Sequence, residues 1–216
     1  MRNLYHEQLD AIVDDLVTLT GTVRRAVAAS TAALLNADAP LAEKVIDGDK
    51  LVDETIENIE ERALLLLATQ QPVATDLRQL VATLRMLTDL ERMGQLAVHV
   101  SKVARLRMPE VAVPTGLQPT IMAMASVADQ MIHAASRIVS DRDVIAAGKL
   151  EDTDDEMDKL RQQLFRTLLS DNWTHGVEPA IDLALLGRYY ERIGDHAVSM
   201  ARRVVYLVTG EIPSPS

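Results

Sequence analysis

The stretches Leu90-Glu-Arg-Met-Gly94 and Tyr190-Glu-Arg-Ile-Gly194 are near copies of each other, and they decide the fold class because they mark an internal repeat. They lie 100 residues apart, and Ala97-Val98 and Ala197-Val198 extend the match at the same offset. A chain that repeats itself at a fixed distance is built from copies of one supersecondary unit. The sequence therefore predicts two tandem copies of such a unit.

A second set of matches supports the same division. At an offset of 105 residues, apolar and acidic positions of the first half land on similar residues of the second half, including Asp38 on Asp143, Asp49 on Asp154 and Asp53 on Asp158. The only loop-rich stretch between the copies is 108–116, which holds two prolines and a glycine. We therefore predict one unit over residues 1–108 and the other over residues 117–216.

Hydrophobic periodicity indicates the secondary structure of each unit. Apolar residues recur three and four positions apart, as on the buried face of an amphipathic helix. The first unit is predicted to hold helices over about 3–36, 41–70 and 75–107, and the second over about 117–139, 150–168 and 177–208. Short connections favour antiparallel neighbours. The predicted fold is all-α, with two tandem three-helix bundles and six long antiparallel helices.

Three residues are predicted to set helix ends. Asp38 is a candidate N-cap for the second helix, with Pro40 in its first turn. Thr75 is the predicted N-cap of the third helix. Gly210 stands where the last apolar stripe ends, which is typical of a C-terminal cap.

Composition excludes several classes of function. The 216 residues carry 32 acidic and 22 basic side chains, a net charge of -10, which argues against binding to nucleic acid or to a membrane through a basic patch. The chain has no cysteine, so disulfides and thiolate metal sites are excluded. No apolar run approaches the roughly 20 residues that span a bilayer, and the N-terminus turns polar at once. We expect a cytoplasmic protein.

Acidic pairs four residues apart are the main candidate for a functional site: Asp49/Asp53, Asp154/Asp158 and Glu191/Asp195, with Glu91/Gln95 in the same register. Residues four apart lie on one face of a helix, where like charges repel unless something neutralises them. A cation bound by oxygen ligands, such as Mg, Mn, Ca or ferric iron, would do so. Alternatively, Arg188 and Arg192 could form ion pairs with Glu191 and Asp195.

The segment Tyr190-Glu-Arg-Ile-Gly-Asp-His-Ala197 resembles the signature L-E-R-I-G-D-H-A of the PhoU family. Asp76-Leu-Arg78 with Leu90-Glu-Arg-Met-Gly94 resembles its first-repeat counterpart, and Tyr5-His-Glu-Gln-Leu9 is similar to the family's opening. The resemblance implies two three-helix bundles. It also implies that a divalent or ferric ion (Mg, Mn, Fe or Zn) is bound by Asp49, Asp53, Glu91, Asp154, Asp158, Glu191 and Asp195. Because Gln95 replaces a family aspartate, the first site is expected to bind metal more weakly.

The resemblance implies a negative regulator of the phosphate-starvation response. Such a protein would be an adaptor, expected as a homodimer, between the ATPase of the phosphate ABC transporter and a sensor histidine kinase. A structural helical adaptor without metal is one alternative. A carboxylate di-metal protein is another, but the Glu-x-x-His motif of such sites is missing from the chain. No nucleophile–base pair or glycine-rich phosphate loop appears, so we predict no enzymatic activity. Because acidic clusters repel phosphate, we also expect no tight binding of free phosphate by the metal-free protein.

Overall fold

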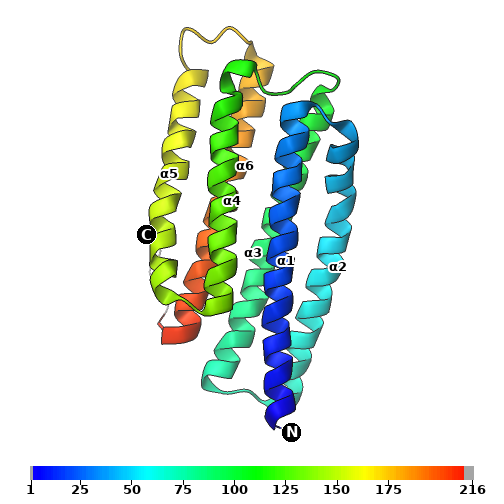
Figure 1. The fold of residues 1–216 in the computed structure, drawn as a ribbon, viewed down its shortest axis with the longest axis vertical. Coiled ribbons are helices and arrows are strands. Elements are labelled where there is room, and N and C mark those ends of the chain that lie inside the picture. Colours follow the sequence, from blue (N-terminus) through cyan, green and yellow to red (C-terminus); the bar gives the residue numbers. More distant parts are fainter. Residues whose placement is uncertain (1, 212–216) are drawn as a thin grey trace.

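The computed structural model describes residues 2–211 (Figure 1), so residues 1 and 212–216 of the two predicted units lie outside the described residues. The elements in chain order are α1 (Arg2–Asn36), α2 (Ala39–Gln70), α3 (Ala74–Arg107), the short 3-10 helix η1 (Thr115–Leu117), α4 (Gln118–Asp141), α5 (Val144–Leu168) and α6 (Val177–Thr209). The predicted all-α fold with six long helices is confirmed. Each of the longest helices extends over about 50 Å at 1.5 Å per residue.

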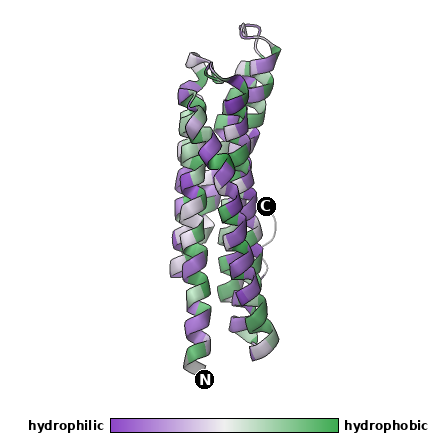
Figure 2. Ribbon diagram, turned by 90° about the vertical axis from the view of Figure 1, so that its right-hand side faces the viewer, coloured by the Kyte–Doolittle hydropathy of each residue, from purple (hydrophilic) through white to green (hydrophobic). Residues whose placement is uncertain are grey.

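The helices form two three-helix bundles that lie side by side (Figure 1). Helices α1, α2 and α3 pack on one another in the first bundle, and α4, α5 and α6 do so in the second. The bundles meet where α3 packs on α6 and α1 packs on α4. Seen from the side, the molecule is a long, narrow slab whose helices mix hydrophilic and hydrophobic residues along their length (Figure 2). Helices α3 and α6 are therefore central, and α2 and α5 are peripheral.

The ends of three helices test the predicted caps. The Asp38 carboxylate accepts a hydrogen bond from the Leu41 amide at 3.0 Å, which confirms it as the cap of α2. Its repeat counterpart Asp143 caps α5 in the same way. The prediction for Thr75 is wrong, because α3 begins at Ala74 and has no side-chain cap. Gly210 ends α6 with φ +79°, as predicted.

Polar contacts link α1 of the first bundle to two helices of the second. The hydroxyl of Tyr190, which is completely buried, lies 2.8 Å from the hydroxyl of Thr31, linking α6 to α1. The Arg24 guanidinium donates two hydrogen bonds to the Asp129 carboxylate, at 2.6 and 2.7 Å, linking α1 to α4. The bundles are thus held in one register by directional contacts as well as by apolar packing. None of the helices between residues 2 and 211 is long and apolar enough to cross a membrane.

Candidate functional site

The predicted metal ligands gather in two places, one in each bundle. The first acidic cluster lies between α2 and α3 and consists of Asp49, Asp53 and Glu91. The second acidic cluster lies between α5 and α6 and consists of Asp154, Asp158, Glu191 and Asp195. Within each cluster the negative charges act on one another, because Asp53 and Glu91 raise the pKa of Asp49, and the other three members of the second cluster raise that of Asp154. The structure therefore places the seven side chains in two groups, one in each bundle.

A glycine of each repeated motif makes room for its cluster. A Cβ atom on Gly94 would lie 3.4 Å from Oδ1 of Asp49, and one on Gly194 would lie 3.3 Å from Oδ1 of Asp154. The missing side chain allows the aspartate of the peripheral helix to approach the backbone of the central helix. The glutamate of each motif stands three residues earlier, close to one turn away on the same helix. Thus Glu-Arg-x-Gly brings the carboxylates of two helices together.

The second cluster carries an excess of negative charge. Burial raises the pKa of Asp154 from 3.8 to about 6, and repulsion from Asp195, Asp158 and Glu191 adds to the effect, while Arg202 opposes it. Burial and Glu191 also raise the pKa of Asp195, against the positive charges of Arg188 and His196. Carboxylates that resist ionisation in this way are suited to a cation, which would remove the repulsion.

The first cluster is partly neutralised by the residues beside it. Burial is the main cause of the raised pKa of Asp49, and the positive charges of Lys102 and His99 lower it. The Gln95 amide donates a hydrogen bond to Glu91 at 2.9 Å and accepts one from Arg92 at 2.8 Å. Glutamine therefore satisfies Glu91 without adding the charge that aspartate supplies at the equivalent position 195.

Arginines compete for the second cluster. Glu191 is only 8% exposed and forms ion pairs with Arg188 and, at 3.5 Å, with Arg161. The ion pair considered for Arg188 is therefore present, whereas Arg192 forms none with any residue that the structure describes. As the side chains lie in residues 2–211, no three acidic or imidazole groups converge on a point where they could hold one ion. The donor set suits a hard cation in charge and chemistry, but Glu191 would have to leave its arginines to join it.

Sequence reasoning missed a polar group between α3 and α6. The carboxylate of Asp89, 7% exposed, contacts Nδ1 of His196 and the hydroxyl of Ser199, both at 3.0 Å. His196, which follows Asp195 in the repeated motif, thus bonds a buried acid of the other central helix. A signal was available, because Asp89 lies between Met86 and Met93 at helical spacing on a buried face. Its partners became visible only when α3 and α6 were known to be neighbours.

Comparison with known proteins identifies the fold's family. The PhoU domain matches residues 16–104 and again residues 121–204. The chain belongs to the PhoU family. A similar relative, phosphate-specific transport system accessory protein PhoU homolog 2 of Mycobacterium bovis, is 42% identical over 213 residues, which cover 99% of this chain and 100% of the relative. The PhoU homolog of Deinococcus radiodurans is 33% identical over 97% of this chain and 99% of its own length.

Crystal structures of PhoU proteins share the architecture. PhoU from Pseudomonas aeruginosa is similar with a TM-score of 0.87 at 27% identity, covering 96% of this chain and 100% of that one. The phosphate transport system regulatory protein PhoU from Streptococcus pneumoniae has a TM-score of 0.88 at 21% identity over 98% and 100%, which shows the fold alone. PhoU proteins are accessory and regulatory proteins of phosphate transport and are not catalytic, in agreement with the predicted lack of enzymatic activity.

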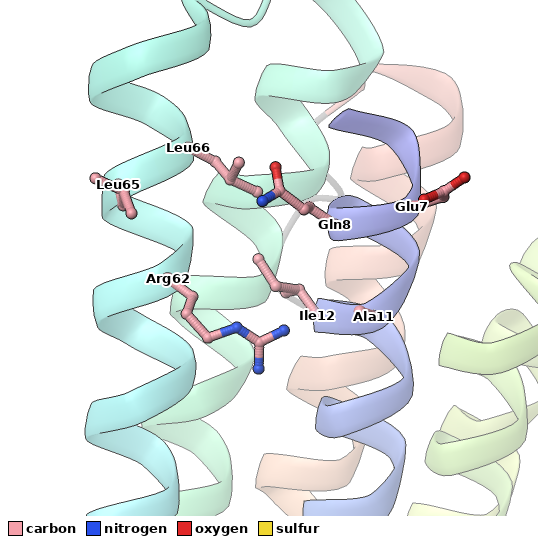
Figure 3. Close-up of a pocket in the computed structure, with 7 residues that line it drawn as sticks. All are labelled: Glu7, Gln8, Ala11, Ile12, Arg62, Leu65 and Leu66. Carbon is pink, nitrogen blue, oxygen red and sulfur yellow. The ribbon is translucent and has the colours of Figure 1, made fainter. Parts of the chain in front are cut away.

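A shallow groove between α1 and α2 is a weaker candidate site in this PhoU protein (Figure 3). It measures about 250 Å³ and is lined by Glu7, Gln8, Ala11, Ile12, Arg62, Leu65 and Leu66. The Arg62 side chain reaches from α2 toward α1 while Glu7 points away from it (Figure 3), and the guanidinium is already paired with Asp15. With its one cation occupied, the groove offers little to bind a charged ligand.

Proposed function

We propose that this protein is a cytoplasmic negative regulator of the phosphate-starvation response, acting as an adaptor between the ATPase of the phosphate ABC transporter and a sensor histidine kinase. The observation that carries the proposal is the 42% identity, over nearly the full length of both chains, to an accessory protein of a phosphate-specific transport system. The elongated double bundle suits such a role, because its long helical faces can contact more than one partner.

Deleting the gene tests this role. Phosphate-scavenging genes should then be expressed in phosphate-rich medium, and a plasmid copy of the gene should restore repression. The deletion strain must lack any second copy of the gene. Scavenging genes that stay silent in such a strain would contradict the proposed negative regulation.

We further propose that the second acidic cluster binds a divalent or ferric ion, such as Mg, Mn, Fe or Zn, and that the first binds more weakly. Asp154 supports this, because burial, together with repulsion from Asp195, Asp158 and Glu191, raises its pKa to about 6. The variant Asp154→Asn/Asp158→Asn should retain less metal after purification. The control Asp152→Asn/Asp155→Asn removes two exposed charges from the same helix and should retain the metal content of the parent. Equal metal in both variants would exclude these ligands.

The two alternatives differ from this proposal in measurable ways. A structural adaptor without metal requires that Asp154→Asn/Asp158→Asn restore repression in the deletion strain as well as the parent gene does. A carboxylate di-metal protein requires coupled iron or manganese ions, detectable by electron paramagnetic resonance. The proposed homodimer predicts a mass in solution of twice the 23.8 kDa of one chain. Light scattering on a size-exclusion column measures it directly.

A further inference from the structure

A basic pocket of about 350 Å³ lies between the central helices, beside the two acidic clusters. The side chains that define this basic pocket are Arg92, Gln95 and His99 of α3 and Tyr189, Arg192 and His196 of α6. The two acidic clusters border it, because Gln95 bonds Glu91 and the positive charge of His196 acts on Asp195. In a protein with a net charge of -10, a concentration of arginine and histidine needs an explanation.

The internal repeat explains why Arg92 and Arg192 line the same pocket. Helices α3 and α6 run antiparallel, since Asp89 near the middle of α3 contacts Ser199, whereas Arg107 at its end contacts Asp182 near the start of α6. At the repeat offset of 100, Asp89 corresponds to Tyr189 and Ser199 corresponds to His99. The rings of Tyr189 and His99 are stacked, with their centroids 5.4 Å apart and their planes at 23°. These paired contacts flank an approximate two-fold axis. Arg92 and Arg192 are equivalent under that axis and face one pocket.

Neither arginine of the pocket is neutralised. Among the described residues, no carboxylate lies within ion-pair distance of Arg92 or Arg192, and the hydrogen bond that Arg92 makes goes to the neutral Gln95 amide. Some arginines of the same two helices do have acidic partners, such as Arg105 with Glu43, Arg107 with Asp182 and Arg188 with Glu191. Two unpaired guanidiniums that line one pocket favour an anion between them, because it would neutralise both charges and accept their hydrogen bonds.

His196 is oriented by its contact outside the pocket. Nδ1 of His196 lies 3.0 Å from a carboxylate oxygen of Asp89, so the orientation of the ring is fixed by a residue that is itself buried. The second ring nitrogen, Nε2, makes no contact with Asp89. His99, stacked on Tyr189, adds a second imidazole.

We propose that the basic pocket binds a phosphate-type dianion, either inorganic phosphate or the terminal phosphate of a monoester. A tetrahedral dianion has enough acceptor oxygens for two guanidinium forks and the imidazoles, which a carboxylate with two oxygens does not. The neighbouring Glu91 and Asp195 limit the ligand to a small anion, because an extended polyanion would meet their charges. This site does not require metal, so the proposal is opposed to the expectation, based on the acidic clusters, that the metal-free protein does not bind free phosphate tightly.

Calorimetry on metal-stripped protein in the presence of a chelator tests the proposal. The probes are inorganic phosphate and glucose 6-phosphate, each at constant ionic strength set with chloride. Arg92→Gln/Arg192→Gln should bind at least tenfold more weakly than the parent. The control Arg25→Gln/Arg137→Gln removes two exposed charges from α1 and α4 and should bind within twofold of the parent. Because the assay uses isolated metal-free protein, its outcome is independent of the partner and metal proposals.

The outcomes separate the two sources of phosphate. Binding of inorganic phosphate alone identifies the free ion as the ligand, and binding of both probes identifies a terminal phosphate group. If the parent binds neither probe, or if both double variants lose affinity equally, the proposed site is wrong. Phosphate-induced shifts of the His99 and His196 ring resonances in the parent locate the anion without any variant. Measurable binding with neither ring shifted would place the anion elsewhere and overturn the assignment.

Discussion

Removing the Asp154 carboxylate should stabilise the metal-free protein at neutral pH. Its pKa rises from 3.8 to about 6 on folding, and each pKa unit corresponds to about 1.4 kcal/mol. Full conversion would give about 3 kcal/mol, but the side chain is half-buried and screened by solvent, so we expect about 1.5 kcal/mol. Asp154→Asn should therefore raise the free energy of unfolding at pH 7.5 by this amount and the Tm by about 4 °C.

The pH dependence has a definite sign. A carboxyl whose pKa is raised in the folded state keeps its proton longer than it does in the unfolded chain, so stability falls as pH rises from about 4 to 6 and stays reduced above that. The gain from Asp154→Asn should consequently shrink to about a third at pH 4.5. Urea denaturation in the presence of a chelator at both values measures it. The exposed Asp152→Asn is the control, and equal stability of the two variants at pH 7.5 would refute the reasoning.

Three further substitutions probe the packing within and between the two repeats. Gly148→Ala, where a Cβ would meet nothing within 4 Å, should stabilise α5 by up to about 1 kcal/mol. In Gly194→Ala the Cβ would lie 3.0 Å from a methionine sulfur, so the steric cost should exceed the gain in helix propensity. Urea denaturation should show this variant to be less stable than the parent by about 1 kcal/mol. If both variants are equally stable, the close approach at Gly194 is not under steric pressure. Tyr190→Phe removes the hydroxyl contact to Thr31, which retains a bond to the Val27 carbonyl. Thermal unfolding should show a loss of about 1 kcal/mol, and a loss above about 3 kcal/mol would mean that Thr31 is left unsatisfied.

The sequence predicted local structure more completely than contacts between the bundles. Apolar periodicity located six helices because each buries a continuous stripe, and Asp38 was recognisable as a cap because its side chain bonds an amide three residues away. The prediction that Thr75 caps α3 was wrong, because the helix already begins at Ala74 and its N-cap residue, Val73, has no side chain that can accept a hydrogen bond. These successes and this failure all concern residues that are close in the chain.

In the candidate site, too, features set by spacing along the chain were predictable and contacts between helices were not. The acidic clusters were predictable, since the spacing of four residues and the repeat assign their members without knowledge of packing. The Asp89–His196 contact joins residues 107 positions apart, and only the crossing of α3 over α6 brings them together. The pairing of Glu191 with Arg161 likewise depends on how α5 rotates against α6. Hydrophobic periodicity describes one helix at a time and contains no information on such rotations.

The approximate two-fold axis between α3 and α6 makes one chain equivalent to a dimer whose halves cannot dissociate. Two identical subunits must carry identical residues at both copies of a site, because one gene encodes them. A tandem duplication is free of that constraint. Here glutamine stands at position 95 and aspartate at 195, so the same scaffold holds a weakly charged and a strongly charged version of one cluster about a common centre. Each version can change by mutation without altering its twin, while their separation and orientation stay constant at any protein concentration.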